Sequence, residues 1–201
     1  MEHGLSERLV TLTRGRAGAL ALVTPEQTTY AHHGCSPDAE FEIGSISKGV
    51  TGLLYHVGLE RGEISATTRL GELLPLTGSA AGGIATHRLG LPRILGAHLW
   101  RRTLDHYRHG TNPYSASVED LVEAALSARL RPGHPAYSNA GFQLLGHALG
   151  AAARLTYADL VRIRVAEPLG LASFDVPASA ADLPPSAVAG YAGRRQVDPW
   201  L

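Results

Sequence analysis

The sequence predicts an α+β fold, in which an N-terminal β-hairpin of an incomplete antiparallel sheet precedes a helical body. Two runs of small, apolar and β-branched residues, 17–24 and 28–33, flank a turn at 25–27, and this pattern is typical of a hairpin. After residue 45, apolar residues recur at helical spacing in several segments. A hairpin alone is marginally stable in water, and no clear strand follows Ala172, so the predicted sheet is incomplete.

We expect one domain over residues 1–201, because a chain of this length can bury a substantial core. The composition is 44% hydrophobic and 18% charged, and the formal net charge is +0. Since there is no basic surplus and no run of about 20 apolar residues, we expect no nucleic-acid partner and no membrane span. Residues 1–18 lack the apolar core of a signal peptide, so the expected location is cytoplasmic.

Two helices are predicted in the first third of the chain. The first covers residues 5–13, with leucines on one side. The second runs from Ser45 to about Glu60, and its apolar residues form a single stripe: Ile46, Val50, Leu53, Leu54 and Val57. Its glycines each lower helix propensity by about 1 kcal/mol relative to alanine. We therefore expect packing in the middle of the domain to hold this helix together.

For the rest of the chain, the sequence predicts mainly short helices and loops. Residues 63–76 form a turn and a short helix that ends at Pro75, and residues 77–113 are irregular. A helix begins at Ser117, where Glu119 and Asp120 suit the first turn. Further helices are predicted over residues 140–153 and 156–166, and the chain from Ala172 onward is predicted to be mostly loop.

Ser45 and Lys48 form the first candidate site. Residues three apart on a helix are neighbours on one face, so the lysine side chain can reach the serine hydroxyl. Lys48 is the only lysine among the 18 Lys and Arg residues. Arginine keeps its proton in proteins, whereas a buried lysine can release it and act as a base toward a serine. The Ser-x-x-Lys spacing therefore fits a serine nucleophile with its base. Serine is common enough in this sequence for the spacing also to arise by chance, so the surrounding residues decide between the two.

Two separated stretches resemble the active-site motifs of the penicillin-recognising serine hydrolases, in particular the branch of class C β-lactamases, esterases and D-alanyl-D-alanine carboxypeptidases. Residues 41–52 match Phe-x-x-Gly-Ser-x-Ser-Lys-x-x-Thr-Gly, a Ser-x-x-Lys motif. Residues 131–141 match a Tyr-x-Asn motif preceded by Pro-Gly. Residues 84–92 resemble a Thr-His-x-Ser-Gly-Leu-Pro segment, with Leu89 in place of serine. The resemblance extends from about Ala17 to Trp200 and implies a β-lactamase/transpeptidase-like fold.

The resemblance also implies a role for each matched residue. Ser45 would be the acylated nucleophile, and Lys48 would take its proton. Tyr137 would share the proton relay and activate water, and Asn139 would bind the substrate amide and orient Lys48. The implied substrate is a β-lactam, a D-amino-acid peptide or a small ester, and no cofactor is expected. Taken singly, Tyr137 is also compatible with an ordinary half-buried tyrosine, and Asn139 with the N-cap of the next helix.

The sequence departs from the family pattern at the third motif, Lys-Thr-Gly or His-x-Gly. None follows Tyr137, and His147-Ala148-Leu149 lacks the glycine. We therefore expect a chain truncated before this motif, without the C-terminal strands. Loss of one oxyanion donor costs about 10²–10³ in rate, so we expect weak activity unless a second polypeptide completes the sheet. The alternative is a catalytically impaired remnant or binding module of the same fold.

No metal site is predicted. His32, His33 and Cys35 lie close together in sequence, and further histidines stand at positions 98, 106 and 109, but their spacing fits no tetrahedral zinc pattern. Cys35 is the single cysteine, so it has no partner for an internal disulfide.

Overall fold

The computed structural model describes six stretches of the chain: residues 2–74, 90–95, 99–112, 117–128, 136–192 and 195–199. The contacts divide the chain into two compact units, Met1–Glu42 with Leu183–Gly190, and Ile43–Asp182 with Tyr191–Leu201. The single domain expected over residues 1–201 stays a prediction. None of the helices in the described stretches combines the length and the apolar character needed to cross a membrane.

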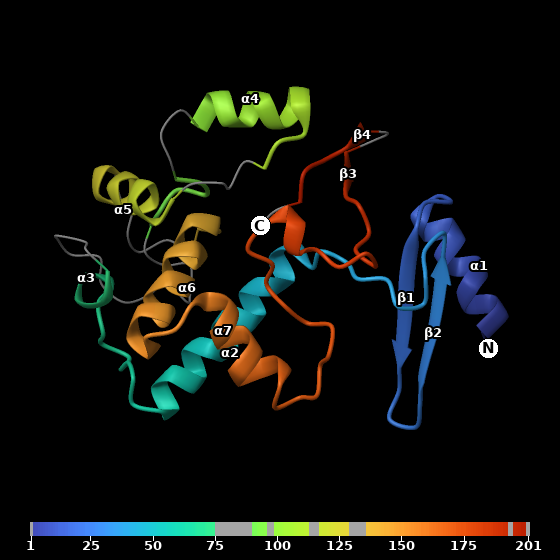
Figure 1. The fold of residues 1–201 in the computed structure, drawn as a ribbon, viewed down its shortest axis with the longest axis horizontal. Helices are drawn as coiled ribbons and strands as arrows, with labels where there is room; N and C mark the ends of the chain where they lie inside the picture. The colour runs from blue at the N-terminus through green and yellow to red at the C-terminus, as the bar shows by residue number, and fades with distance from the viewer. Residues whose placement is uncertain are drawn as a thin grey trace. The chain divides into compact units, whose positions relative to one another are not determined.

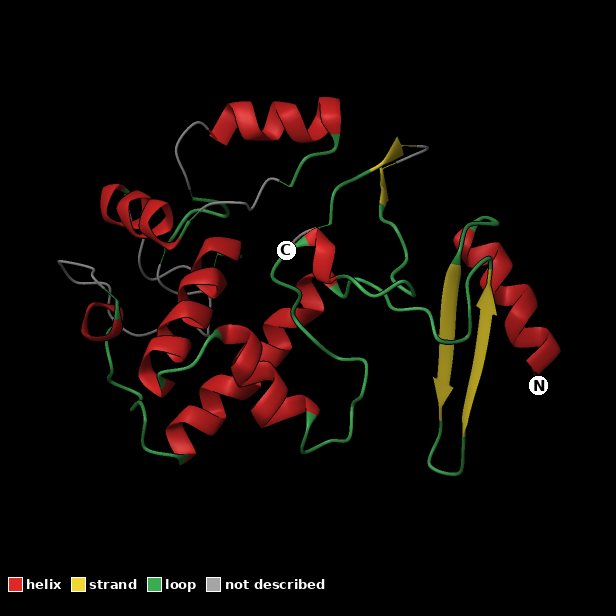
Figure 2. Cartoon of the chain, in the orientation of Figure 1, coloured by secondary structure: helices red, strands yellow, loops and turns green. Residues whose placement is uncertain are grey.

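The first unit contains the predicted hairpin (Figures 1 and 2). It comprises α1 (Glu2–Thr13), β1 (Gly18–Val23) and β2 (Thr28–His33). The strands are antiparallel, with Gly18 opposite His33 and Val23 opposite Thr28. Leu9 of α1 is 2% exposed and Ala31 of β2 is 5% exposed, so α1 covers one face of the hairpin and forms a small core with it.

The second unit is mainly helical (Figures 1 and 2). Its elements, in order, are η1 (Gly44–Ile46), α2 (Ser47–Glu60), α3 (Leu70–Leu73), α4 (Leu99–His109), α5 (Val118–Ser127), α6 (Asn139–Ala153), α7 (Tyr157–Val161), the π-helical η3 (Arg162–Ala166), the 3-10 helix η4 (Ala180–Asp182), β3 (Tyr191–Ala192) and β4 (Arg195–Gln196). β3 and β4 pair with each other in antiparallel register.

Helix α6 is the centre of the second unit. It contacts α2, α3, α5 and α7, and Figure 1 shows it beside α2. Its sequence alternates leucines with glycine and alanine, and these small residues let neighbouring helices approach closely. Leu144 is fully buried and Leu149 is 4% exposed. Since α2 and α7 both pack on α6, the segment that carries Ser45 is tied to the segment that follows Tyr137.

Helix α2 differs from the predicted stripe. Leu54 is 1% exposed, whereas Ile46 and Leu53 are 72% and 44% exposed. The contacts of α2 with α6, α7 and η3 explain the difference, because these elements cover only the face that carries Thr51, Leu54 and Gly58. The predicted stripe is therefore buried at Leu54, while Ile46 and Leu53 at its edges are exposed.

Two predicted loop regions contain regular structure. Helix α4 lies within residues 77–113, which were expected to be irregular. Its apolar residues do recur at helical spacing, a local signal that the sequence analysis missed: Leu99, Trp100, Leu104 and Tyr107. The β3–β4 hairpin lies after Ala172 and forms only two residue pairs, too short to show an alternating pattern. Within the turn and short helix predicted over 63–76, α3 is the short helix, and α7 and η3 together account for the helix predicted over 156–166.

Candidate active site

Ser45 lies in the 3-10 helix η1, immediately before α2 begins at Ser47. Gly44 precedes it with φ +50, a left-handed conformation that residues with a side chain seldom adopt. The Ile46 N–H donates to the Ile43 carbonyl at 3.1 Å, which closes the turn. Ser45 is exposed, so its hydroxyl is accessible to a small molecule.

Lys48 lies one turn after Ser45. Its Nζ donates a hydrogen bond to Ser45 Oγ at 3.2 Å. The same ammonium lies 4.9 Å from the centroid of the Tyr137 ring and 5.9 Å from that of Phe142. Both distances are within the range of a cation–π contact. The two rings and the serine therefore fix the position of the charge.

Tyr137 reaches the same point from the N-terminus of α6. Its hydroxyl oxygen is 2.7 Å from Ser45 Oγ, although the two residues are 92 positions apart. Ser138 caps α6 by accepting from the Gly141 N–H at 3.0 Å and donates to the Pro92 carbonyl at 2.7 Å. The loop that contains Pro92 thus anchors the start of α6 and, with it, the tyrosine that precedes the helix.

The surroundings of Tyr137 favour its ionised form. Hydrogen bonding to Lys48 is the largest cause that lowers the pKa of the phenol, and hydrogen bonding to Ser45 is the second. Partial burial opposes this shift, while the nearby guanidinium of Arg93, 5.6 Å from the ring centroid, adds to it. The phenolate of Tyr137 therefore forms at a lower pH than that of an ordinary tyrosine.

Asn139 is the first residue of α6 and is half-buried. Its backbone N–H donates to the Arg93 carbonyl at 2.9 Å, so its place in the helix is fixed. The structure thus brings Ser45, Lys48 and Tyr137 into mutual contact and places Asn139 two residues after the tyrosine. The role of Asn139 toward a substrate stays a prediction.

Arg93 is a residue of this region that the sequence analysis missed. It is exposed, and its guanidinium lies against the Tyr137 ring. It lies in the loop just after the segment at 84–92, where no periodic pattern identifies it. Thr86, His87, Leu89, the Pro-Gly at 132–133, His98, Gly193 and Trp200 lie outside the described residues.

The cluster of His32, His33 and Cys35 is part of the first unit's hairpin region. His32 Nδ1 is 3.1 Å from the Cys35 carbonyl oxygen, and Cys35 Sγ donates to the Gly18 carbonyl at 3.4 Å. Across the described ranges, no three His, Cys, Asp or Glu side chains gather as a metal site would require.

Comparison with known proteins finds one matching family model and several similar structures. The Beta-lactamase family model matches residues 5–200. A class C beta-lactamase from Rhodobacter sphaeroides is similar in structure, with a TM-score of 0.72 and 25% sequence identity over 98% of this chain. A penicillin-binding protein from Bacillus halodurans has a TM-score of 0.72 and 21% identity over 92% of this chain.

A beta-lactamase/D-alanine carboxypeptidase from Yersinia pestis has a TM-score of 0.67 and 22% identity over 90% of this chain. Among curated proteins, a sequence search found no match. The chain spans 57% of the Rhodobacter protein, 58% of the Yersinia protein and 59% of the Bacillus protein. These likenesses confirm the predicted β-lactamase/transpeptidase-like α+β fold.

Proposed function

The chain belongs to the beta-lactamase family, and from this premise we propose that it is a serine hydrolase that cleaves an amide or ester through an acyl-enzyme on Ser45. One observation carries the proposal. Ser45 Oγ is hydrogen-bonded to both Tyr137, at 2.7 Å, and Lys48, at 3.2 Å. A nucleophile in contact with a titratable group and a fixed positive charge is the arrangement that activates a serine.

In the proposed first step, Ser45 Oγ attacks the substrate carbonyl carbon while its proton passes to the Tyr137 oxygen. Lys48 Nζ donates to Ser45 Oγ, which leaves the serine proton free to point at Tyr137. The geometry therefore supports Tyr137 as the immediate base, with Lys48 stabilising its phenolate, rather than Lys48 itself as the first acceptor. The intermediate then expels an amine or alcohol, which takes the proton from Tyr137, and an ester remains on Ser45.

In the proposed second step, water attacks this ester. Tyr137 takes a proton from the water, and Ser45 regains a proton as the acid leaves. Asn139, in the first turn of α6, is proposed to hydrogen-bond the substrate amide. The helix N-terminus beside it contributes a positive dipole end that favours negative charge on a bound group.

The substrate class is proposed from the similar proteins. Their descriptions name beta-lactamases and a beta-lactamase/D-alanine carboxypeptidase. We therefore propose a β-lactam or a peptide ending in a D-amino acid as the substrate, and a small ester as the remaining choice. Each carries the carbonyl carbon that an activated serine attacks.

A second candidate function is binding of such molecules without turnover. The observation that favours it is that no Lys-Thr-Gly or His-x-Gly follows Tyr137 within the 201 residues. In this candidate the contacts among Ser45, Lys48 and Tyr137 bind the ligand, and turnover needs a third motif from outside these 201 residues, either from the same protein or from a second polypeptide. Covalent labelling separates the two candidates.

The test is covalent labelling with a fluorescent penicillin and with a fluorophosphonate probe. We expect a labelled band for the natural sequence and none for Ser45→Ala, because the label bonds to Ser45 Oγ. Lys48→Arg is expected to lose labelling as well, since the bulkier guanidinium cannot occupy the place of the ammonium. The matched control is Ser127→Ala, which removes an exposed serine of α5 and is expected to label normally.

Labelling that persists in Ser45→Ala would show that the nucleophile is wrong. Folded protein that takes no label but binds fluorescent penicillin reversibly, as measured by fluorescence anisotropy, would favour the second candidate. Folded protein that neither reacts with nor binds either probe would contradict both.

A further inference from the structure

We infer that Tyr157 is a positioning residue for this site. Its hydroxyl holds the first turn of α2, which contains Lys48 and directly follows Ser45 of η1, at a fixed separation from α6. That separation determines how closely Ser45 approaches Tyr137, which precedes α6. The inference rests on the proposed function, because it concerns the same site.

A chain of two hydrogen bonds leads from Tyr157 to the site. The Tyr157 hydroxyl is 2.7 Å from Thr51 Oγ1, and Thr51 Oγ1 donates to the Ser47 carbonyl at 3.1 Å. A hydroxyl has one proton, and Thr51 uses its proton on Ser47, so Tyr157 must be the donor to Thr51. The chain ends at Ser47, which lies between the nucleophile and the lysine.

The chain is shielded from water. Thr51 is 5% exposed, and Tyr157 is half-buried. Burial raises the pKa of Tyr157, so it stays a neutral donor at physiological pH. Because water has little access to Thr51, the bond from Tyr157 has no ready replacement if the hydroxyl is removed.

The ring of Tyr157 makes the contact with α6. A Cβ added at Gly146 would lie 3.2 and 3.3 Å from two ring carbons of Tyr157, closer than most real contacts. Gly146 is therefore the residue that lets the ring lie against α6. The ring sets the distance from α7 to α6, and the hydroxyl sets the distance from α7 to α2.

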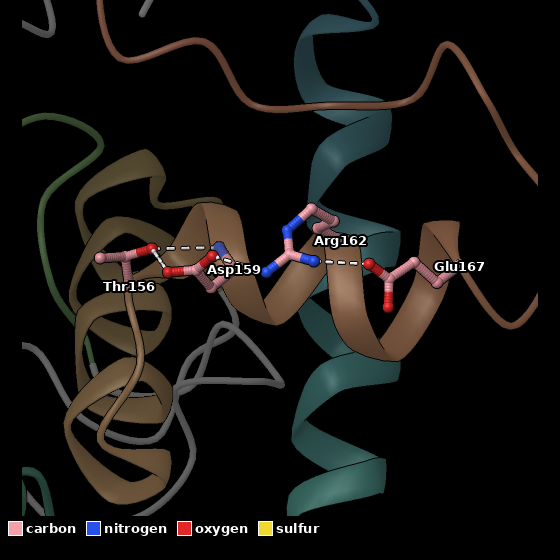
Figure 3. A network of polar contacts seen from close by, with 4 residues as sticks. All are labelled: Thr156, Asp159, Arg162 and Glu167. Atoms are coloured by element: carbon pink, nitrogen blue, oxygen red, sulfur yellow. Dashed lines mark hydrogen bonds and ion pairs between the residues drawn. The ribbon is translucent and has the colours of Figure 1, made fainter.

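The backbone of Tyr157 is itself held in place. Tyr157 is the first residue of α7, and Thr156 caps that helix by accepting from the Asp159 N–H at 3.0 Å. Thr156 Oγ1 also donates to Asp159 Oδ2 at 2.8 Å. Figure 3 shows that Arg162 then bridges Asp159 and Glu167, which extends the network into η3. Tyr157 is thus anchored before it contacts either of the other helices.

The test is the variant Tyr157→Phe, which keeps the ring on Gly146 and removes only the hydroxyl. The probe is the fluorophosphonate, and the maximal acylation rate and the half-saturating probe concentration are measured separately. We expect the rate to fall about tenfold or more, because misplacement by 1 Å costs up to about a hundredfold, with little change in half-saturation. Thr51→Val is expected to reproduce the loss, and Thr51→Ser, which keeps the hydroxyl, to retain most of the rate.

The matched control is Tyr55→Phe, which removes a hydroxyl from a half-buried tyrosine of the same helix α2 and is expected to leave the rate unchanged. All rates are measured well below the unfolding midpoint of each variant, so lost stability alone does not lower them. If Tyr157→Phe and Thr51→Val acylate as fast as the natural sequence, the inference is wrong.

A second readout separates failure of this inference from failure of the proposed function. The pKa of Tyr137 is followed by NMR of ring-labelled tyrosine, with Tyr137→Phe identifying the signal. We expect Tyr157→Phe to raise this pKa, because the phenol then lies farther from Lys48. If the natural sequence takes no label, the proposed function fails, and the titration of Tyr137 alone tests the inference. A pKa of Tyr137 that is unchanged in Tyr157→Phe would then overturn the inference.

Discussion

At the scale of single residues, the chemistry proposed for Ser45 depends on the charge state of Tyr137. Its phenol oxygen touches the serine at 2.7 Å, and the lysine ammonium lies 4.9 Å from its ring centroid. Lys48 is the largest cause of the lowered pKa of Tyr137. A fixed cation beside a phenol favours the phenolate, because the charge pair exists only in the ionised state.

We predict that Lys48→Met raises the pKa of Tyr137 toward its ordinary value of about 10. With the lysine present, the phenolate forms at lower pH, so acylation rises with pH through the lowered pKa. Without the lysine, both the phenol titration and the rise in acylation move to higher pH. The measurement is the NMR titration of ring-labelled tyrosine, and Tyr137→Phe serves as the control. An identical Tyr137 titration in both proteins would contradict the assigned role of Lys48.

The contact between Ser45 and Lys48 could be predicted because it is local. Helical spacing alone brings a side chain three residues later over the serine, and the distance of 3.2 Å agrees with that expectation. The approach of Tyr137 depends on how α6 packs on α2, and only the resemblance to a family identified it beforehand. Arg93 was missed because an irregular loop, fixed by hydrogen bonds from α6, brings it to the tyrosine.

At the scale of secondary structure, α2 is a helix with unequal faces. The face toward α6 contains Leu54 at 1% exposure, while the adjoining Leu53 is 44% exposed. The two leucines are neighbours in sequence and chemically identical. Comparing the same substitution at the two positions therefore measures how much packing, as opposed to residue type, contributes to the stability of the helix.

We predict that Leu54→Ala lowers the free energy of unfolding by about 2–5 kcal/mol, because it removes buried methyl groups and leaves a cavity. Leu53→Ala is the matched control, and its effect is expected to stay within about 0.5–1 kcal/mol, because its side chain is already partly in water. The measurement is urea unfolding of both variants, with the slope compared to that of the natural sequence. Equal losses for the two leucines would mean that the exposed face of α2 is covered in solution.

The sequence predicted most of the helices around α6 because caps and periodicity are local signals. Ser117 and Thr156 accept hydrogen bonds from backbone N–H groups three residues later, as N-cap residues do. The exposure of Ile46 and Leu53 was not predictable, since hydrophobic residues also occur on exposed surfaces. Periodicity shows which residues share a face and does not show whether another element covers that face.

At the scale of the whole molecule, the two compact units differ greatly in the size of their cores. In the first unit, Leu9 and Ala31 are the buried apolar side chains among the described residues. The second unit contains a continuous core built on α6, with Leu144, Leu145 and Leu149 at its centre. Hydrophobic stabilisation scales with the apolar area buried, so the free energy needed to open each unit should differ as well.

Strand pairing was the part of the fold that the sequence predicted least completely. The β1–β2 hairpin is confirmed in position, because its turn residues and strand composition are local. Strand pairing over long separations follows from the folded topology and leaves little trace in the sequence. One example in the described residues is the parallel bridge between Glu40 and Ala187, where the Glu40 N–H donates to the Ser186 carbonyl at 3.0 Å.

We predict that native-state hydrogen exchange separates the two units. Amides of α6 are expected to exchange slowest, near the limit set by global unfolding. Amides of β1 and β2 are expected to exchange through local openings that require less free energy. Leu9→Ala tests the cause, because it removes the side chain that α1 packs on the hairpin. It should speed exchange in β1 and β2 and leave α6 unchanged. If Leu9→Ala speeds exchange in α6 as much as in the hairpin, the chain unfolds as one cooperative domain, as first expected for residues 1–201, and the two units do not open independently.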